Sequence, residues 1–256
     1  MKRAKKYRLD ELLVIRGLCE SRSRAKALIM AGKVKHETTI LDKPGKEYPE
    51  DLELTLTEPP KYVSRGGEKL DGFLKSHPIP ISGSLVLDIG ASTGGFTDCL
   101  LQKGAIHSTC VDVGHGQLHY QLQKDERVTN LEKVHAKELS PQKLPHPQYD
   151  IIVMDLSFIS ITKIIPVIWP FLKPGGHLIA LVKPQFEASK KEADRFKGVI
   201  SDLRTRNSIV QEVIEFIQNN IQEAKLYGQC NSPIRGAKGN LEELAGWTKL
   251  DNRLSN

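Results

Sequence analysis

The sequence contains a glycine-rich segment whose residue types and spacing could bind a nucleoside cofactor. The apolar run Leu85–Leu87 is followed by Asp88 and Gly90, and then by Gly94 and Gly95, before a helical pattern begins. This order predicts a strand, a tight turn and a helix, which brings bare backbone and a helix N-terminus against a ligand. The segment lacks the Lys-Ser/Thr pair of a phosphate-binding loop, which disfavours pyrophosphate and triphosphate ligands. S-adenosylmethionine fits better, because it is cationic and has no phosphate. The residues predicted to bind it here are Asp88, Gly90, Ala91, Ser92, Thr93, Gly94, Gly95 and Phe96.

Asp112 ends the second predicted strand, twenty-four residues after Asp88. An acidic side chain at that edge can accept hydrogen bonds from the ribose hydroxyls of a bound adenosyl group. Two structural alternatives stay open. The glycine-rich segment could be a plain strand-to-helix turn in a domain without ligand, and Asp112 could cap the turn that contains Gly114 and Gly116. We favour the ribose role because the first turn already indicates a nucleoside.

Four further polar residues fall at strand ends or in loops. Asp155 ends the apolar run Ile151–Met154, and Lys183 ends the run Leu178–Val182, so both should lie at the same sheet edge as the glycine-rich turn. A lysine at such an edge can act as a base towards a hydroxyl nucleophile when its surroundings favour the neutral amine, while carboxylates orient it. The alternative is a pair of salt bridges that only steady the loops. The four candidates are Lys69, Asp155, Lys183 and Glu242.

Other residue types exclude several classes of protein. His115, His119 and His135 have no cysteine pair or acidic residue at ligand spacing, which argues against a metal site. The four cysteines form no C-x-x-C pair, which argues against a disulfide framework and indicates a reducing cytoplasm. The charged N-terminus is unlike a secretory signal, and charged residues and prolines interrupt the apolar region 151–182. We therefore expect a soluble cytoplasmic protein without a metal.

Positive charge is concentrated in the first 35 residues. They contain eleven Lys/Arg and three acidic residues, a net charge of +8, whereas the whole chain carries +6 and the remaining 221 residues therefore about −2. A basic segment beside a slightly acidic one suggests a polyanionic partner, because cations that contact phosphates release counterions. A solvated helix face that keeps the protein soluble is the alternative.

The basic segment has the pattern of a small α+β module. Residues 8–16, which Gly17 follows, and residues 20–32, which end at Gly32, have helical spacing. Residues 33–35 and 52–56 alternate like short strands. Over roughly residues 7 to 58 the segment resembles the S4 RNA-binding domain. The resemblance implies that Arg22, Arg24 and Lys26 face RNA, although positions spaced at two cannot all share one helix face, so that some would cap a helix or pair with Glu20. The full set of predicted RNA-binding residues is Arg8, Arg22, Arg24, Lys26, Lys33, Lys35 and Arg65.

A second, larger domain follows a short connector. We assign residues 1–58 to the first domain, 59–62 to a stiff proline-containing linker and 63–256 to the second domain. Strands are predicted at residues 85–88, 108–112, 128–133, 149–155 and 176–183, with helices between them, an active-site flap or loop at 186–198 and an amphipathic helix at 209–221. Alternating strands and helices predict an α/β fold with a doubly wound, mostly parallel sheet of Rossmann type.

Several long motifs carry a resemblance to the TlyA family, whose members pair an S4 domain with an FtsJ-like methyltransferase domain and are often labelled hemolysins. The motifs are Val63–Leu70, Asp88–Leu101, Val111–Leu118, Asp155–Ser160, Lys183–Glu187 and Gly239–Glu242. The resemblance covers nearly the whole chain. It implies S-adenosylmethionine-dependent 2′-O-methylation of ribosomal RNA at cytidine, with Lys69, Asp155, Lys183 and Glu242 as the catalytic tetrad. It also places His135 where the family contacts adenine.

The expected partners are ribosomal RNA or ribosomal subunits, with no membrane and no obligate protein partner. Two other functions are the alternatives. A membrane-damaging protein, as the hemolysin label would suggest, has no support from a span, a signal or a basic amphipathic helix with an aromatic face. An RNA-binding module whose cofactor fold no longer catalyses is opposed by the intact tetrad.

Overall fold

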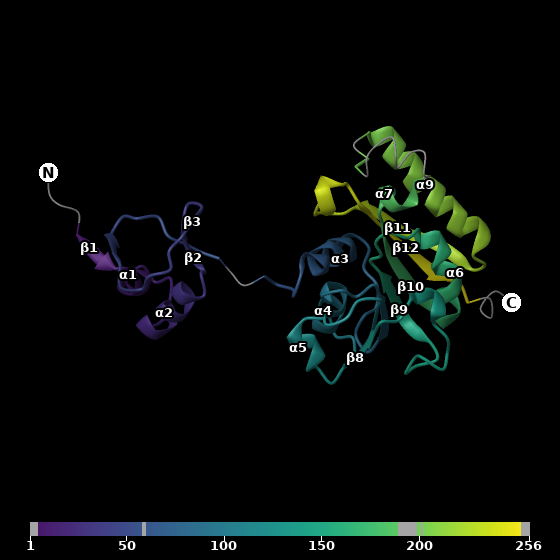
Figure 1. Ribbon diagram of the computed structural model, residues 1–256, viewed down its shortest axis with the longest axis horizontal. Coiled ribbons are helices and arrows are strands. Elements are labelled where there is room, and N and C mark those ends of the chain that lie inside the picture. Colours follow the sequence, from purple (N-terminus) through teal and green to yellow (C-terminus); the bar gives the residue numbers. More distant parts are fainter. Residues whose placement is uncertain (1–4, 58–59, 189–198, 201, 252–256) are drawn as a thin grey trace. The chain divides into compact units, whose positions relative to one another are not determined.

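The structure is a computed structural model, in which residues 5–57, 60–188, 199–200 and 202–251 are described. The chain divides into two compact units, Met1–Pro60 and Lys61–Asn256 (Figure 1). The expected linker at 59–62 and the expected flap at 186–198 lie partly outside the described residues.

The N-terminal unit packs two helices against short strands. Its elements are β1 (Lys6–Arg8), α1 (Leu9–Ile15), α2 (Arg22–Met30), β2 (Val34–His36), β3 (Thr39–Ile40), β4 (Glu47–Pro49) and β5 (Thr55–Leu56). β1 pairs with β4, and β2 lies between β3 and β5, all antiparallel. Leu9 and Leu13 of α1 pack with Ala25 and Ile29 of α2 in a small core. Both predicted helices are present, the strands predicted at 33–35 and 52–56 are found in shifted or shortened form, and β1, β3 and β4 were not predicted.

The C-terminal unit alternates strands and helices. Its helices and strands are α3 (Arg65–Ser76), β6 (Leu85–Ile89), α4 (Gly95–Gln102), β7 (His107–Asp112), α5 (Tyr120–Gln123), β8 (Val128–Glu132), β9 (Tyr149–Met154), α6 (Ile165–Ile168), β10 (Leu172–Val182), α7 (Pro184–Glu187), α9 (Leu203–Asn220), β11 (Ala224–Asn231) and β12 (Glu243–Lys249). Short 3₁₀ turns are η1 (Ala136–Glu138), η2 (Ile161–Lys163), η3 (Trp169–Phe171) and η4 (Ala237–Gly239).

One seven-stranded sheet forms the centre of this unit, in the order β11-β12-β10-β9-β6-β7-β8. The five strands from β10 to β8 are parallel and correspond to the five predicted strands. β12 runs antiparallel to β10 and to β11, and this antiparallel pair was not predicted. The sheet is therefore α/β and mostly parallel, as expected, with an antiparallel edge.

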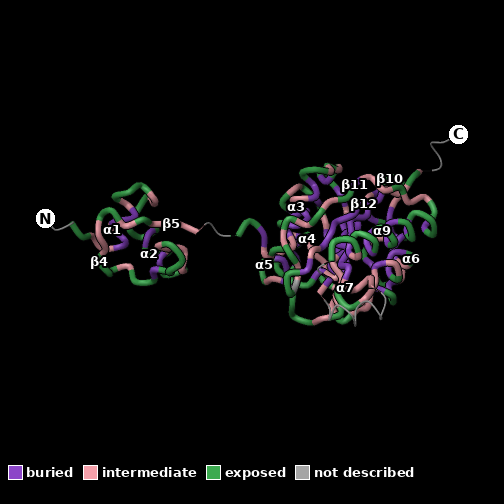
Figure 2. Tube along the Cα trace, turned by 90° about the horizontal axis from the view of Figure 1, so that it is seen from above, coloured by how far each residue is buried: buried purple, intermediate pink, exposed green. Residues whose placement is uncertain are grey.

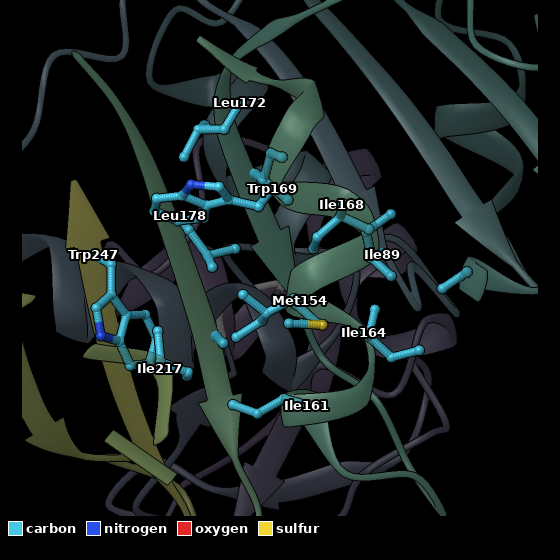
Figure 3. Close-up of a cluster of buried hydrophobic side chains, with 14 of the residues drawn as sticks. Ile89, Met154, Ile161, Ile164, Ile168, Trp169, Leu172, Leu178, Ile217 and Trp247 are labelled. Atoms are coloured by element: carbon cyan, nitrogen blue, oxygen red, sulfur yellow. The ribbon is translucent and has the colours of Figure 1, made fainter. Parts of the chain in front are cut away.

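Apolar residues on both sides of each central strand explain why helices cover both faces. On β9, Ile151 and Val153 cluster with residues of α3 and α4, whereas Ile152 and Met154 cluster with residues of α6 and α9. Figure 1 shows α3 and α4 on one side of the sheet and α6 and α9 on the other. This follows from the alternation of side chains along a strand. Figure 2 shows the buried segments gathered in the middle of this unit. Figure 3 shows the hydrophobic cluster on the α6 and α9 side of the sheet, where Met154 and Leu178 lie near Ile217 of α9 and Trp247 of β12.

Candidate active site

β6 ends in a turn that lies directly against the end of β9. Gly90 has a φ of +79°, and a Cβ at this position would lie 2.6 Å from the carbonyl oxygen of Asp155. A larger residue would be strained and would push the two strand ends apart. Gly90 N also donates a hydrogen bond to Val111 O at 2.8 Å, and Gly94 is the N-cap residue of α4, which begins at Gly95. The turn therefore joins the carboxyl ends of three parallel strands.

Asp88 presents one open oxygen at this turn. Its side chain is buried, and Oδ2 accepts hydrogen bonds from Thr97 N at 3.1 Å and Thr97 Oγ1 at 2.7 Å. Oδ1 has no hydrogen-bond partner among the described residues. Burial, together with the charges of Asp155 and Asp112, raises the pKa of Asp88 to about 7. A buried acceptor without a partner suits a cationic group such as an ammonium.

A cavity of about 290 Å³ opens beside the turn and gathers most of the predicted residues. It is lined by Ser64, Arg65, Gly66, Lys69, Asp88, Gly90, Ala91, Ser92, Thr93, Gly95, Phe96, Asp155, Ser157 and Lys183. Predicted cofactor-binding residues and three members of the predicted tetrad thus share one cavity. Arg65, predicted from the sequence to contact RNA, is exposed at its wall as the first residue of α3.

A second cavity of about 330 Å³ shares Gly90, Ser92, Asp155 and Ser157 with the first. Its other lining residues are mostly apolar: Ile89, Val111, Asp112, Val113, Gln117, Val134, Ala136, Leu156 and Phe158. The combination of an apolar wall and the Asp112 carboxylate suits an adenosyl group. Apart from Asp112, these wall residues could not be predicted from the sequence, because single apolar residues beyond a strand end carry no recognisable spacing.

Of the two remaining predicted cofactor-binding residues, Asp112 lines one of the two cavities and His135 lines neither. Asp112 lines the second cavity, while its Oδ2 accepts from Ser92 N at 2.8 Å and its Oδ1 from Gly114 N at 2.7 Å. The turn-capping hydrogen bond weighed above is therefore present, and it leaves the carboxylate at the cavity wall. His135 instead accepts from Lys137 N through Nδ1 at 3.1 Å and is absent from the residues that line either cavity.

Two ion pairs bring together the four residues of the predicted tetrad. Lys183 Nζ lies 2.6 Å from Asp155 Oδ1, and Lys69 Nζ lies 2.6 Å from Glu242 Oε2. Lys183 also donates to Ser157 Oγ at 3.1 Å, a partner that was not predicted from the sequence. Both lysines are largely buried, yet both line the first cavity. They can therefore act on a ligand there as well as steady the loops.

In the N-terminal unit, three predicted RNA-binding residues surround one buried carboxylate. Asp10 accepts from Arg8 Nε at 3.1 Å and Arg22 Nη2 at 3.2 Å, and Lys26 Nζ lies 4.0 Å away. Arg22 also pairs with Glu11 at 2.9 Å, so its acidic partners are Asp10 and Glu11.

The remaining predicted RNA-binding residues of this unit lie elsewhere. Arg24 is exposed and forms no ion pair within the described residues, although its backbone N–H donates to Ser21 Oγ at 3.2 Å. Lys33 immediately precedes β2, and Lys35 lies on β2 opposite Ile40 and Thr55. The predicted RNA-binding residues of this unit therefore fall into two groups. Arg8, Arg22 and Lys26 surround Asp10, whereas Arg24, Lys33 and Lys35 form no ion pair with it.

Among the residues that the structure describes, no three His, Cys, Asp or Glu side chains lie close enough to hold a metal ion together. No helix in the described part of the chain combines the length and apolar character needed to cross a membrane.

Comparison with known proteins decides the family. The FtsJ-like methyltransferase family matches residues 62–248, and the S4 domain matches residues 8–53. The chain is 38% identical over 260 residues to "16S/23S rRNA (cytidine-2'-O)-methyltransferase TlyA" of Mycobacterium tuberculosis, covering 98% of this chain and 94% of that protein. The chain belongs to the TlyA family. This confirms the resemblance found in the sequence.

Two further similar proteins support the assignment. "Putative rRNA methyltransferase YqxC" of Bacillus subtilis is 43% identical over 242 residues, covering 94% of this chain and 85% of that protein. The solved structure of "Putative hemolysin from Streptococcus thermophilus" superposes with a TM-score of 0.72 at 36% identity, covering 97% of this chain and 90% of that chain. The C-terminal unit therefore has the fold of an FtsJ-like methyltransferase, and the N-terminal unit is an S4 domain.

Proposed function

We propose that this protein transfers a methyl group from S-adenosylmethionine to the ribose 2′-oxygen of a cytidine in ribosomal RNA. The observation that carries the proposal is the shared cavity, in which Lys69 and the Lys183–Asp155 pair lie beside a nucleoside-type turn, with Lys69 held by Glu242. Relatives whose names specify ribosomal RNA, and in one case cytidine 2′-O-methylation, support the substrate class.

The residues of the two cavities fit the cofactor. S-adenosylmethionine supplies an electrophilic methyl group on its sulfonium when bound. Asp88 Oδ1, the unpaired buried acceptor, would hold the amino group, and the backbone beyond Gly90 would admit the methionine end. Asp112 would accept from the ribose hydroxyls, and the apolar wall of the second cavity would enclose the base.

Lys183 is the residue we assign to the substrate hydroxyl. A ribose 2′-hydroxyl is a weak acid, so a positioned base must take up its proton as the oxygen attacks. Lys183 Nζ lies at the cavity wall and is held by Asp155 and Ser157, which fix its direction. In its neutral form Nζ accepts the proton. Lys69, held by Glu242, contributes positive charge on the same wall.

The N-terminal unit would hold the RNA. It matches the S4 domain, and its first 35 residues carry a net charge of +8, which favours binding to phosphates without reading sequence. The catalytic unit would then act on one ribose.

Mapping of 2′-O-methyl groups tests the proposal. Purified protein is incubated with S-adenosylmethionine and ribosomal RNA or isolated ribosomal subunits, and protected ribose positions are compared with those from the Asp155→Ala variant. We expect a new 2′-O-methyl cytidine with the natural chain and none with the variant. Methylation of a base instead of a ribose, or no transfer to any ribosomal RNA, would contradict the proposal.

A further inference from the structure

Asp155 follows β9 and Lys183 follows β10, so the ion pair between them depends on contacts between the two segments that come after these strands. Asp155 begins the loop 155–160 after β9, and Lys183 immediately precedes α7 after β10. The loop also supplies Ser157, which accepts from Lys183 Nζ at 3.1 Å. A shift of this loop relative to α7 would change both contacts of the lysine.

Glu187, at the end of α7, reaches across to the far end of that loop. Its Oε2 accepts from Ser160 Oγ at 2.5 Å, and its Oε1 accepts from Ile161 N at 3.0 Å. Ser160 is the N-cap residue of η2, where its Oγ accepts from Thr162 N at 3.2 Å. One carboxylate thus joins the helix after Lys183 to the 3₁₀ turn that ends the Asp155 loop.

The loop needs such support because its backbone is strained. Phe158 has a φ of +65°, a conformation that is unfavourable for a bulky residue and persists only when the surroundings enforce it. Its ring lies 5.0 Å from that of Phe186, which immediately precedes Glu187. Two consecutive residues of α7 therefore contact the same loop, one through an aromatic ring and one through a carboxylate.

We propose that Glu187 is a positioning residue that holds the loop 155–160 so that Asp155 and Ser157 stay aligned with Lys183. It touches neither cavity and does not take part in proton transfer. The inference rests on the proposed function, because it assigns Glu187 to the alignment of the proposed base. Misplacement of a reacting group by about 1 Å can slow a reaction by about 100-fold.

The test compares Glu187→Ala with Glu187→Gln and with Glu212→Ala as a matched control. The amide oxygen of glutamine can still accept from Ile161 N, whereas alanine removes both hydrogen bonds. Glu212 is exposed on α9 and bonds only to Ser208 in the described contacts. Single-turnover methyl transfer, cofactor affinity and hydrogen exchange at the Ile161 amide are measured for each full-length variant.

We expect Glu187→Ala to slow transfer by about 10- to 100-fold at saturating cofactor. Cofactor affinity should change little, and the Ile161 amide should lose its protection. Glu187→Gln should recover most of the rate, and Glu212→Ala should match the natural chain.

If Glu187→Ala transferred methyl groups as fast as the unmutated protein, the inference would be wrong. A loss of rate that only follows a loss of folded protein or of cofactor affinity would also contradict it, because a purely structural role predicts that pattern. If the natural chain itself transfers no methyl group to RNA, the proposed function fails, and that failure is separate from the comparison among variants.

Discussion

Lys69 on α3 and Glu242 immediately before β12 form a buried ion pair, with 2.6 Å between Nζ and Oε2, although they are 173 positions apart in the sequence. The pair links the first helix of the catalytic unit to its last strand. Its lysine also faces the cavity that contains Asp155 and Lys183. The ion pair therefore both stabilises the fold and positions Lys69 at the cavity.

Breaking this pair should destabilise the catalytic unit. Glu242→Ala leaves the Lys69 ammonium without its partner, and removal of one member of a buried pair costs about 3–5 kcal/mol. Urea unfolding followed by tryptophan fluorescence reports on this unit alone, because both tryptophans, Trp169 and Trp247, lie in it. The double variant Lys69→Met with Glu242→Leu should recover much of the loss. If the unfolding free energy of Glu242→Ala equalled that of the unmutated protein, solvent would be replacing Glu242 as the partner of the Lys69 ammonium, and the prediction would be wrong.

Gly236 should be intolerant of a side chain. A Cβ at this position would lie 1.9 Å from Glu242 Oε1, so Gly236→Ala must displace the carboxylate from Lys69. We expect methyl transfer to fall at least about tenfold, with cofactor affinity kept. Lys238→Ala, an exposed change in the same loop, is the control and should be neutral. Equal rates for Gly236→Ala and the control would show that the position of Glu242 does not matter for transfer.

Cofactor affinity should depend on pH through Asp88. Burial raises its pKa to about 7, so this carboxyl is partly protonated near neutral pH. A cationic amino group binds the ionised form, and affinity should therefore increase from about pH 6 to about pH 8, with proton release on binding. Calorimetry in two buffers of different ionisation enthalpy measures that release. Asp88→Asn should bind more weakly and lose the pH dependence, and a pH-independent natural chain would contradict the assignment.

The same group gives a stability prediction of opposite sign for the cofactor-free protein. The pKa of Asp88 in the folded state lies above its ordinary value of 3.8, so the folded state binds the proton more tightly. The resulting stabilisation is complete below about pH 4 and is lost as the pH rises through about 7. The unfolding free energy of the natural chain minus that of Asp88→Asn should therefore fall over this range.

Arg24 and Arg22 should behave differently in RNA binding. Arg24→Ala removes an exposed cation without an ion pair in the described structure, so binding should weaken uniformly and the salt slope should decrease by about 1. Arg22→Ala also removes partners of Asp10 and Glu11, so it should lower the melting temperature of the N-terminal unit as well. Titration of RNA at several salt concentrations, beside melting curves, separates the two. A destabilised Arg24→Ala or a fully stable Arg22→Ala would contradict this division.

Local patterns predicted much of this molecule, and long-range contacts account for what they missed. The turn at Asp88 and Gly90 and the strand ends at Asp155 and Lys183 were recognisable because each follows a short apolar run. α3 was not predicted as a helix, since Gly66 and Gly67 are poor helix formers and its buried face becomes clear only from packing against α4.

The antiparallel edge and the cluster around Asp10 were missed for a related reason. β11 has mixed exposure along its length, so it carries no clean alternation that would identify a strand. Asp10 gathers Arg8, Arg22 and Lys26 across two helices and a strand, and no spacing in the sequence shows which cations meet one carboxylate.

The most direct test of the account is single-turnover methylation of ribosomal RNA as a function of pH by the natural chain, Lys183→Ala and Lys183→Arg. If Lys183 Nζ is the base, Lys183→Ala should abolish transfer while cofactor affinity stays nearly intact. Lys183→Arg should fail as well, because guanidinium keeps its proton. Transfer by Lys183→Arg at nearly the natural rate would show that charge and position suffice and that Lys183 is not the base.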